Sequence, residues 1–134
     1  MAYRVQLLFL CTLLFSTAFA ASDIEREKRL ASQIVDSIID GEPVFLKSGY
    51  QEFHSIYAEA DEPSGAVIIM HGRGFHPNWS DAVYPLRTGL VEQDWNTLSL
   101  QMPVLDKDAR YYDYLEIMHE AYPRIEAGDR KSTR

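Results

Sequence analysis

One stretch constrains the fold more than any other: an unbroken apolar run over residues 66–70 that turns at once into His71-Gly72-Arg73-Gly74. A short apolar run bounded by turn residues is typical of a strand that is buried on both faces of a parallel sheet. A sheet with helices on both faces binds ligands at the carboxyl ends of its strands. We therefore expect the His-Gly-Arg-Gly segment to lie where the fold carries its chemistry.

Hydrophobic periodicity divides the rest of the chain into alternating elements. An amphipathic helix is predicted over residues 22–39, with Ser22 and Asp23 as caps. The pattern then predicts a hairpin of two strands, the central strand, a helix, a strand and a last helix that is interrupted near Pro123, which indicates an α/β domain with a parallel sheet. The expected bounds after the first helix are 44–46, 52–60, 66–70, 82–93, 95–102 and 112–127.

Side-chain positions follow from the same pattern. His54 lies on an alternating strand without an acidic or histidine neighbour at ligand spacing, so we expect a surface or rim residue. We interpret residues 21–42 as a helix at the domain edge or a linker, and residues 43–128 as the domain itself. The expected apolar faces of the last two helices are Val83, Leu86, Leu90 and Val91, and Leu115, Met118, Tyr122 and Ile125.

The first twenty residues have the features of a secretory signal peptide. A basic Arg4 precedes an apolar run over residues 5–15, and Ala18 and Ala20 are small residues at the positions that a signal peptidase reads. The apolar run is shorter than the roughly 20 residues that span a bilayer. We expect cleavage after Ala20 and export to the periplasm or beyond, with no membrane contact afterwards. The only cysteine, Cys11, lies in this segment, so no disulfide is expected.

Charge and spacing exclude several classes of ligand. The net charge of −7 argues against nucleic acid, which requires clustered Lys and Arg. His71 and His76 do not have metal-ligand spacing, and the Gly-Arg-Gly segment lacks both a dinucleotide fingerprint and a P-loop. We expect neither a metal nor a cofactor. Arg73, Arg87 and His76 could together bind an anionic substrate, or each could be solvated or paired.

A strand that ends in His-Gly and opens into a loop resembles the oxyanion loop of the α/β-hydrolase fold. The stretch HGRGFHPNWSDAVYPLRTGLVEQDWNTLSLQMPVL is similar to a family of secreted proteobacterial α/β-hydrolase-like proteins of uncharacterised function. The shared motifs are His-Gly, then His-Pro and Trp in the loop, Pro-Leu-Arg in the helix and Trp-x-Thr-Leu-Ser in the next strand. The resemblance covers roughly residues 43–126.

This resemblance implies a partial α/β-hydrolase-like sheet, a small-molecule or acyl substrate as partner, and a role for each loop residue. The hairpin would form the first two strands of that fold, and residues 66–70 and 95–102 the third and fourth. The backbone N–H of Arg73 would stabilise negative charge on a carbonyl oxygen, while His71 would orient the loop without acting as the base. Gly72 and Gly74 would supply unusual backbone angles and close approach to a substrate.

The departures from the family pattern concern the catalytic groups. No Gly-x-Ser-x-Gly motif occurs, Ser80 is predicted in a loop, and Ser99 within a strand. Histidines 54, 71, 76 and 119 do not replace the base, which that fold places near its carboxyl end. We therefore expect an amino-terminal fragment that ends before the nucleophile elbow and is inactive alone. Residues 129–134 are abruptly polar and resemble a translated sequencing adapter, so we expect a non-native tail.

Three readings remain open from the sequence. The full-length form could be a serine hydrolase of esters or other acyl compounds. It could instead be an exported, non-catalytic binding domain that keeps the fold, because fold alone does not fix function. A serine between glycines after a fifth strand would distinguish the first from the second. Finally, a half-sheet with exposed strand edges could aggregate without forming a stable protein.

Overall fold

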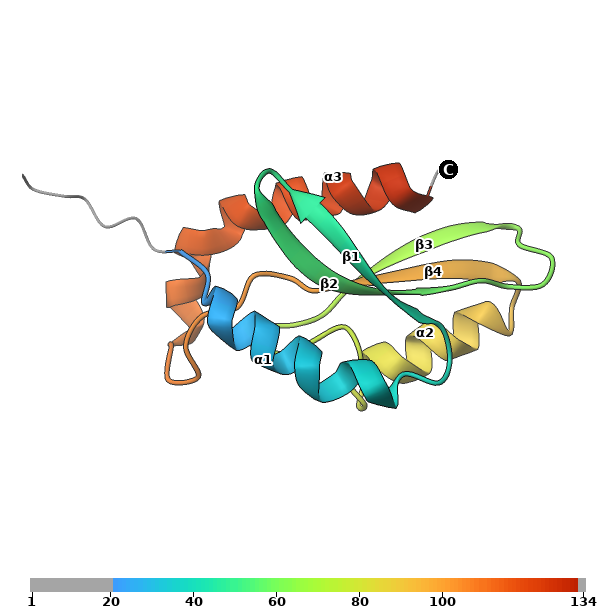
Figure 1. Cartoon of the computed structure of the whole chain (residues 1–134), viewed down its shortest axis with the longest axis horizontal. Coiled ribbons are helices and arrows are strands. Elements are labelled where there is room, and N and C mark those ends of the chain that lie inside the picture. The colour runs from blue at the N-terminus through green and yellow to red at the C-terminus, as the bar shows by residue number, and fades with distance from the viewer. Residues whose placement is uncertain (1–20, 133–134) are drawn as a thin grey trace, which may run out of the picture.

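The computed structural model describes residues 21–132 and has mixed α/β architecture (Figure 1). The predicted order of elements is confirmed, whereas the signal-peptide prediction, with Cys11, lies outside the described residues. A helix, a hairpin and a strand-helix-strand unit are followed by a long helical segment. The elements are α1 (Ile24–Ile34), η1 (Val35–Ser37), β1 (Glu42–Ser48), β2 (Gln51–Ala58), β3 (Gly65–Met70), α2 (Val83–Val91), β4 (Trp95–Leu100), η2 (Tyr111–Glu120) and α3 (Ala121–Ser132).

The four strands form one mixed sheet in the order β1-β2-β4-β3. β1 and β2 are antiparallel, as the predicted hairpin requires, and Gly49 supplies a positive φ of 62° in its tight turn. β2 also pairs antiparallel with β4, so the prediction of a parallel sheet holds only for β3 and β4. In that parallel pair Val67 lies opposite Thr97, and α2 connects the two strands.

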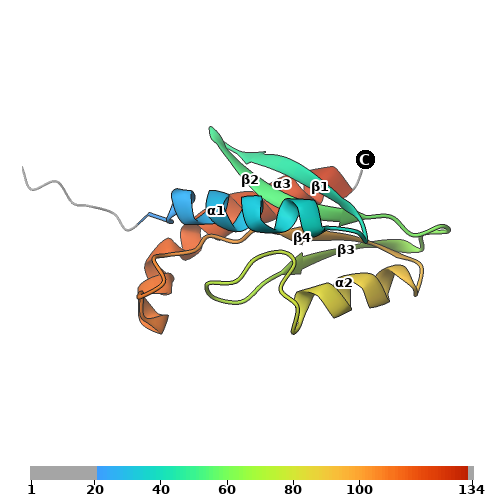
Figure 2. The ribbon, with the colours of Figure 1, turned by 60° about the horizontal axis from the view of Figure 1, so that its bottom comes forward.

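Helices cover both faces of the sheet (Figure 2). α3 packs on one face, where Ala127 meets Phe53, Leu98 and Leu100 in the hydrophobic core. A Cβ added at Gly128 would lie 3.0 Å from the Leu100 side chain, so α3 approaches the sheet closely at this point. α1 and α2 pack against the other face.

The central apolar run forms β3 but is not buried on both faces as predicted. Ile69 is the one residue of β3 that is fully buried, Val67 and Ile68 are half-buried, and Met70 is 52% exposed. The reason is its position: β3 lies at the edge of the described sheet, with β4 as its strand neighbour on one side. An apolar sequence pattern therefore identified the strand correctly but not its burial.

The predicted apolar face of α2 is wrong at one position. Val83 is buried as expected, but Leu86 is 52% exposed and Arg87 is fully buried in its place. Pro85 lies in the first turn of the helix, where its missing N–H removes no intrahelical bond. The inward face of α2 therefore includes Arg87, which donates to Asn78 in the loop that follows β3.

The predicted last helix consists of a 3₁₀ segment, η2, followed by α3, and the change lies at Glu120 and Ala121 instead of Pro123. A 3₁₀ helix has about three residues per turn, so an apolar stripe with α-helical spacing does not stay on one face of it. The inward residues are accordingly Ile117, Ala121 and Ala127. The predicted stripe is wrong for its larger members, since Leu115, Met118 and Tyr122 are at least half exposed.

Two further observations concern the end of α3 and the length of the helices. α3 continues to Ser132, so the polar composition beyond residue 128 does not end the helix. Among residues 21–132, no helix is long and apolar enough to cross a bilayer.

Candidate functional site

The loop after β3 begins with a tight turn that requires glycine at one position. The Phe75 N–H donates to the Gly72 carbonyl at 3.3 Å, and Gly74 has a φ of +76° at the third residue of this turn. These features define a type II turn, in which the third residue favours glycine. Gly72 has no positive φ, and a Cβ there would meet only Phe75 at 3.7 Å. The expected need for unusual backbone angles is therefore observed at Gly74 but not at Gly72.

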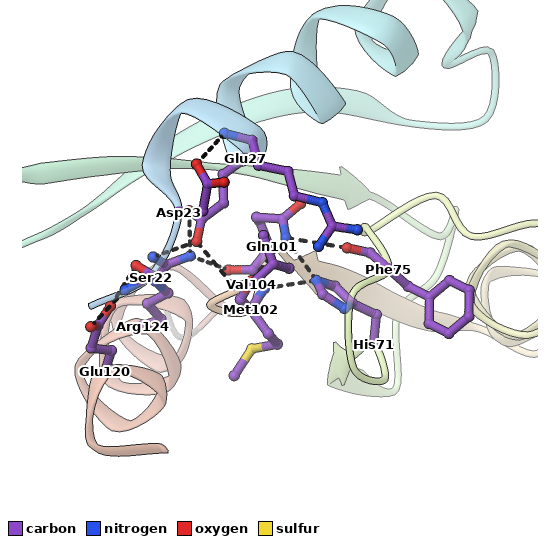
Figure 3. Close-up of polar contacts among 11 residues, drawn as sticks. Ser22, Asp23, Glu27, His71, Phe75, Gln101, Met102, Val104, Glu120 and Arg124 are labelled. Atoms are coloured by element: carbon purple, nitrogen blue, oxygen red, sulfur yellow. Dashed lines mark hydrogen bonds and ion pairs between the residues drawn. The ribbon is translucent and has the colours of Figure 1, made fainter. Parts of the chain in front are cut away.

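His71 joins the ends of the two parallel strands (Figure 3). Its Nδ1 lies 2.7 Å from the Gly72 carbonyl oxygen, and its Nε2 accepts from the Met102 N–H at 2.9 Å. The two contacts assign the proton to Nδ1, because only a protonated Nδ1 can donate to a carbonyl. Burial lowers the pKa of His71 to about 4, so its ring is neutral at physiological pH. His71 thus holds the turn after β3 against the segment that leaves β4.

Gln101 strengthens this junction immediately after β4. Its side-chain amide donates to the Met102 carbonyl at 2.8 Å and lies 3.0 Å from His71 Nε2. Its backbone N–H donates to the His54 carbonyl at 3.0 Å. β4 ends at Leu100, whereas residues 101 and 102 were expected to extend it. Both contact His71, and Gln101 also keeps a backbone hydrogen bond to β2.

A second set of contacts ties α1 to the same region. Arg26 donates to the Gly74 carbonyl at 3.2 Å and also to the Leu105 carbonyl. The next residue of α1, Glu27, accepts from the Val104 N–H at 3.2 Å. α1 thereby contacts both loops that follow the parallel strands.

Glu27 also forms a buried ion pair with Arg124 of α3 (Figure 3). The Arg124 guanidinium donates to both carboxylate oxygens, at 2.9 and 3.1 Å, and to the Gln101 carbonyl at 2.9 Å. Burial raises the pKa of Glu27, while the hydrogen bond and charge of Arg124 oppose that rise. This pair was not predicted from the sequence, because its two residues are 97 positions apart.

The remainder of the loop is fixed by residues of the resemblance motifs. The buried Ser99 hydroxyl donates to the Pro77 carbonyl at 2.8 Å, and Phe75 stacks on Trp79 with ring centroids 3.8 Å apart. Arg87 donates to the Asn78 side chain at 2.9 Å and to the Asp40 carbonyl. These motif residues hold the loop in place, which sequence reasoning did not recognise.

The three residues considered for an anionic substrate have separate environments. Arg87 is fully buried and its hydrogen bonds go to protein groups, so it is not available to a ligand. His76 accepts from the Asn78 N–H at 3.2 Å, and burial lowers its pKa. Arg73 is exposed, and its guanidinium lies 5.7 Å from the Tyr111 ring centroid and 6.0 Å from that of Tyr114. Only Arg73 therefore presents its charge outward.

Arg73 borders a hollow at the carboxyl ends of β3 and β4, which we call the β3–β4 hollow. Its volume is about 340 Å³, and His71 and Gly72 lie at the same rim. Within residues 21–132, the N–H groups of Arg73 and Gly74 donate to no protein acceptor. Of these two residues, Arg73 borders the hollow, whose lining is mostly apolar and includes Met70, Met102, Tyr111, Leu115, Ile117 and Met118.

His54 is not the surface residue that was predicted. It is 3% exposed, neither ring nitrogen has a hydrogen-bond partner, and burial lowers its pKa to about 4. It borders a second hollow, about 470 Å³ in volume, between α1 and the hairpin. The alternation of β2 placed His54 on the face that α1 covers, which the hairpin alone does not reveal.

The described chain offers neither a metal cluster nor an activated serine. Residues 21–132 contain no group of three or more His, Cys, Asp or Glu side chains that could hold a metal ion. Ser99 Oγ donates to the Pro77 carbonyl, and Ser80 Oγ lies 3.1 Å from the Asp81 carboxylate. Neither hydroxyl bonds to a histidine, the usual activating base.

The comparisons with known proteins assign a family. Residues 16–116, more than half of the chain, match the family model described as "Protein of unknown function (DUF3530)". No curated protein and no solved structure matches the chain. By this match, the protein that carries the β3–β4 hollow belongs to the DUF3530 family.

Proposed function

We propose that this chain is part of an exported α/β-hydrolase-like protein that acts on esters or related acyl compounds. In this proposal the chain supplies the oxyanion loop and part of the acyl pocket. The observation that carries the proposal is the free N–H of Arg73 beside an apolar hollow at the carboxyl ends of two parallel strands. Backbone N–H groups in such a position stabilise the negative charge that develops on a carbonyl oxygen during acyl transfer.

Rigidity of the loop supports this role. An oxyanion donor is effective when it is oriented before the reaction, because no reorganisation is then required. His71 donates to the Gly72 carbonyl of the turn, and Arg26 donates to the Gly74 carbonyl. The Gly72 carbonyl and the Arg73 N–H belong to one planar peptide unit and point in opposite directions. The contact of His71 with that carbonyl therefore also fixes the direction of the Arg73 N–H, and we assign this N–H to the substrate.

The chain does not supply the rest of the catalytic machinery in this proposal. His71 uses both ring nitrogens in hydrogen bonds that hold the loop, and its pKa of about 4 makes it a poor base. The hydroxyls of Ser80 and Ser99 are bonded to Asp81 and to the Pro77 carbonyl. We therefore expect the purified chain to bind acyl compounds without hydrolysing them.

A non-catalytic binding domain is the second candidate. It is favoured by the same engagement of His71 and Ser99 in structural hydrogen bonds, since a binding domain needs the hollow but no base. The two candidates differ in one property of the family. A member that contains a serine between glycines after a fifth strand should hydrolyse esters, whereas members without that serine should only bind them.

Export is a separate part of the proposal. It is supported by the basic residue, the apolar run and the small residues within residues 1–20. Expression of the full chain in a bacterium, followed by fractionation and mass spectrometry, provides the test. The expected product is periplasmic and begins at Ala21. A cytoplasmic product that begins at Met1 would contradict export.

Two substitutions of Arg73 test the oxyanion role. Arg73→Pro removes the N–H, and proline is favoured at the second position of a type II turn, so the turn should persist. Arg73→Ala is the matched control, because it removes the side chain but keeps the N–H. The probe is ethyl butyrate, a small neutral ester, and binding is followed through amide chemical shifts in NMR spectra.

We expect Arg73→Pro to weaken ethyl butyrate binding by about fivefold or more, the loss of one net hydrogen bond. Arg73→Ala should bind it as the unaltered chain does. Equal binding by the two variants would contradict the oxyanion role. Release of butyrate by the purified chain above the uncatalysed rate would contradict the absence of a nucleophile.

A further inference from the structure

We infer that the ligand of the β3–β4 hollow is an amphiphilic anion, with a carboxylate on the Arg73 guanidinium and an apolar chain among the methionines. This inference deepens the proposed function, and rests on it for the location of the site. The inference adds a role for the side chain of Arg73, whereas the oxyanion role in the proposed function concerns only the backbone N–H.

The Arg73 guanidinium has no anionic partner within the described residues. Residues 21–132 contain no Asp or Glu in an ion pair with Arg73, and its contacts are the faces of Tyr111 and Tyr114. Arginine in contact with aromatic rings keeps its planar donors free for a carboxylate, which it can bind through two parallel hydrogen bonds. In a chain of net charge −7, an outward-facing unpaired arginine at a cavity rim is an anion site.

The other basic side chains near the hollow are paired with protein groups or neutral. Arg110, just before η2, is paired with Asp113 at 3.0 Å. Arg26 donates to the Gly74 and Leu105 carbonyls, and His71 is neutral. Among these neighbouring groups, Arg73 alone offers an unpaired positive charge. A ligand that carries a single anionic group therefore matches the charge of the site.

The lining of the hollow is apolar and partly exposed. Met70, Leu115 and Met118 border the hollow and are 52%, 64% and 50% exposed, so apolar surface is concentrated beside Arg73. Clustered exposed apolar side chains mark binding sites in soluble proteins. Methionine side chains are flexible and adapt to ligands of different shape. An unbranched acyl chain is the ligand that such a lining accommodates.

The test compares octanoate with octanol, two probes that share an apolar chain and differ in charge. Binding to the purified chain is measured by isothermal titration calorimetry at neutral pH and low salt. Octanoate should bind about tenfold more tightly than octanol, because only the carboxylate forms an ion pair with paired hydrogen bonds to the Arg73 guanidinium. The advantage should decrease in high salt, as expected for a solvent-exposed charge.

Three variants separate the guanidinium from general charge effects. Arg73→Ala should reduce octanoate affinity about tenfold and leave octanol affinity unchanged. Arg73→Lys should recover part of the loss, because an ammonium group keeps the charge without the planar pair of donors. The matched control is Arg29→Ala on the exposed surface of α1, which removes the same charge and should not change either affinity. Circular dichroism establishes that each variant is folded.

The outcomes distinguish this inference from the proposed function. Equal affinity for octanoate and octanol, or an unchanged octanoate affinity in Arg73→Ala, overturns the anion site, even if the proline variant shows that the N–H binds an ester. Octanoate binding that depends on the Arg73 side chain supports the anion site, even if ethyl butyrate does not distinguish the proline and alanine variants. Failure of both octanoate and octanol to bind overturns the hollow as a ligand site.

Discussion

Arg124 of α3 donates to both carboxylate oxygens of Glu27 on α1, and the two side chains are only 2% and 5% exposed. The pair connects helices on opposite faces of the sheet beside the end of β4, where Arg124 also bonds the Gln101 carbonyl. α1 is therefore part of the structure that holds the loops around the β3–β4 hollow. Removing either partner should affect the whole domain.

Substitution of Arg124 provides the first prediction. Arg124→Met leaves the Glu27 carboxylate buried without a counter-charge, which should lower the free energy of unfolding by about 3–5 kcal/mol. The double variant Glu27→Leu with Arg124→Met should recover much of this loss, since no buried charge remains. Urea unfolding measures both. Lys28→Met is the control, because its pair with Glu25 is exposed and should contribute less than about 1 kcal/mol. A loss no larger than that of the control would contradict the assigned role.

The turn at Gly74 provides the second prediction. With a φ of +76°, Gly74→Ala should lower the free energy of unfolding by about 1–2 kcal/mol, because a Cβ is strained in the left-handed region. Gly72→Ala is the matched control, two residues away and without a positive φ, and should change stability by less than about 0.5 kcal/mol. If the two variants were equally stable, the turn geometry described above would be incorrect.

Ser99 provides the third prediction. Ser99→Ala leaves the Pro77 carbonyl without its buried donor, which should lower the free energy of unfolding by about 1–3 kcal/mol. Ser80→Ala, on the exposed part of the same loop, should change it by less than about 0.5 kcal/mol. The comparison is made by thermal and urea unfolding. A neutral Ser99→Ala would mean that this hydroxyl does not fix the loop.

The buried histidines make stability depend on pH. Burial lowers the pKa values of His54 and His71 to about 4, from 6.5 in the unfolded chain. The unfolded state therefore binds protons first as the pH falls, so their contribution is constant above pH 6.5 and stability is lost between pH 6.5 and 4. The loss amounts to up to about 3 kcal/mol for each histidine. The pKa of Glu27 is raised in the folded state, so its effect has the opposite sign: its contribution to stability decreases as the pH rises above 4.5.

Urea unfolding at a series of pH values measures this dependence. His54→Leu removes one of three histidines whose pKa burial lowers, the others being His71 and His76. The loss of stability on acidification should therefore decrease by about a third to a half. Ser80→Ala, which removes no titratable group, is the control and should leave the dependence unchanged. A His54→Leu variant that loses stability as steeply as the unaltered chain would contradict the burial of this neutral ring.

Local patterns in the sequence predicted the local features of the fold. The order of the elements followed from periodicity, Asp23 caps α1 by accepting from the Arg26 N–H at 2.9 Å, and Gly49 and Gly74 occupy turns. Each of these features depends on residues that are close in the sequence. The α/β-hydrolase relationship and the export of the chain stay predictions.

The features that sequence reasoning missed depend on residues that are distant in the sequence. Arg87 was considered for an anionic substrate or as a solvated or paired residue, and Arg124 was not singled out. Both are buried, because Asp40 and Glu27 supply partners from far earlier in the chain. His54 is buried because α1 covers its strand. The inward face of η2 differs from prediction because a 3₁₀ helix has a different period. No single-sequence pattern reports these long-range contacts.

In the proposed function and the further inference, the carboxyl ends of β3 and β4 form a ligand site around Arg73. The most direct test is a titration of the ¹⁵N-labelled chain with octanoate, followed by amide chemical shifts in two-dimensional NMR spectra. We predict that the largest changes occur at residues 72–74, at Met102 and at Leu115 and Met118, all around the β3–β4 hollow. Changes confined to the hollow between α1 and the hairpin, or no saturable change at residues 72–74, would contradict the account.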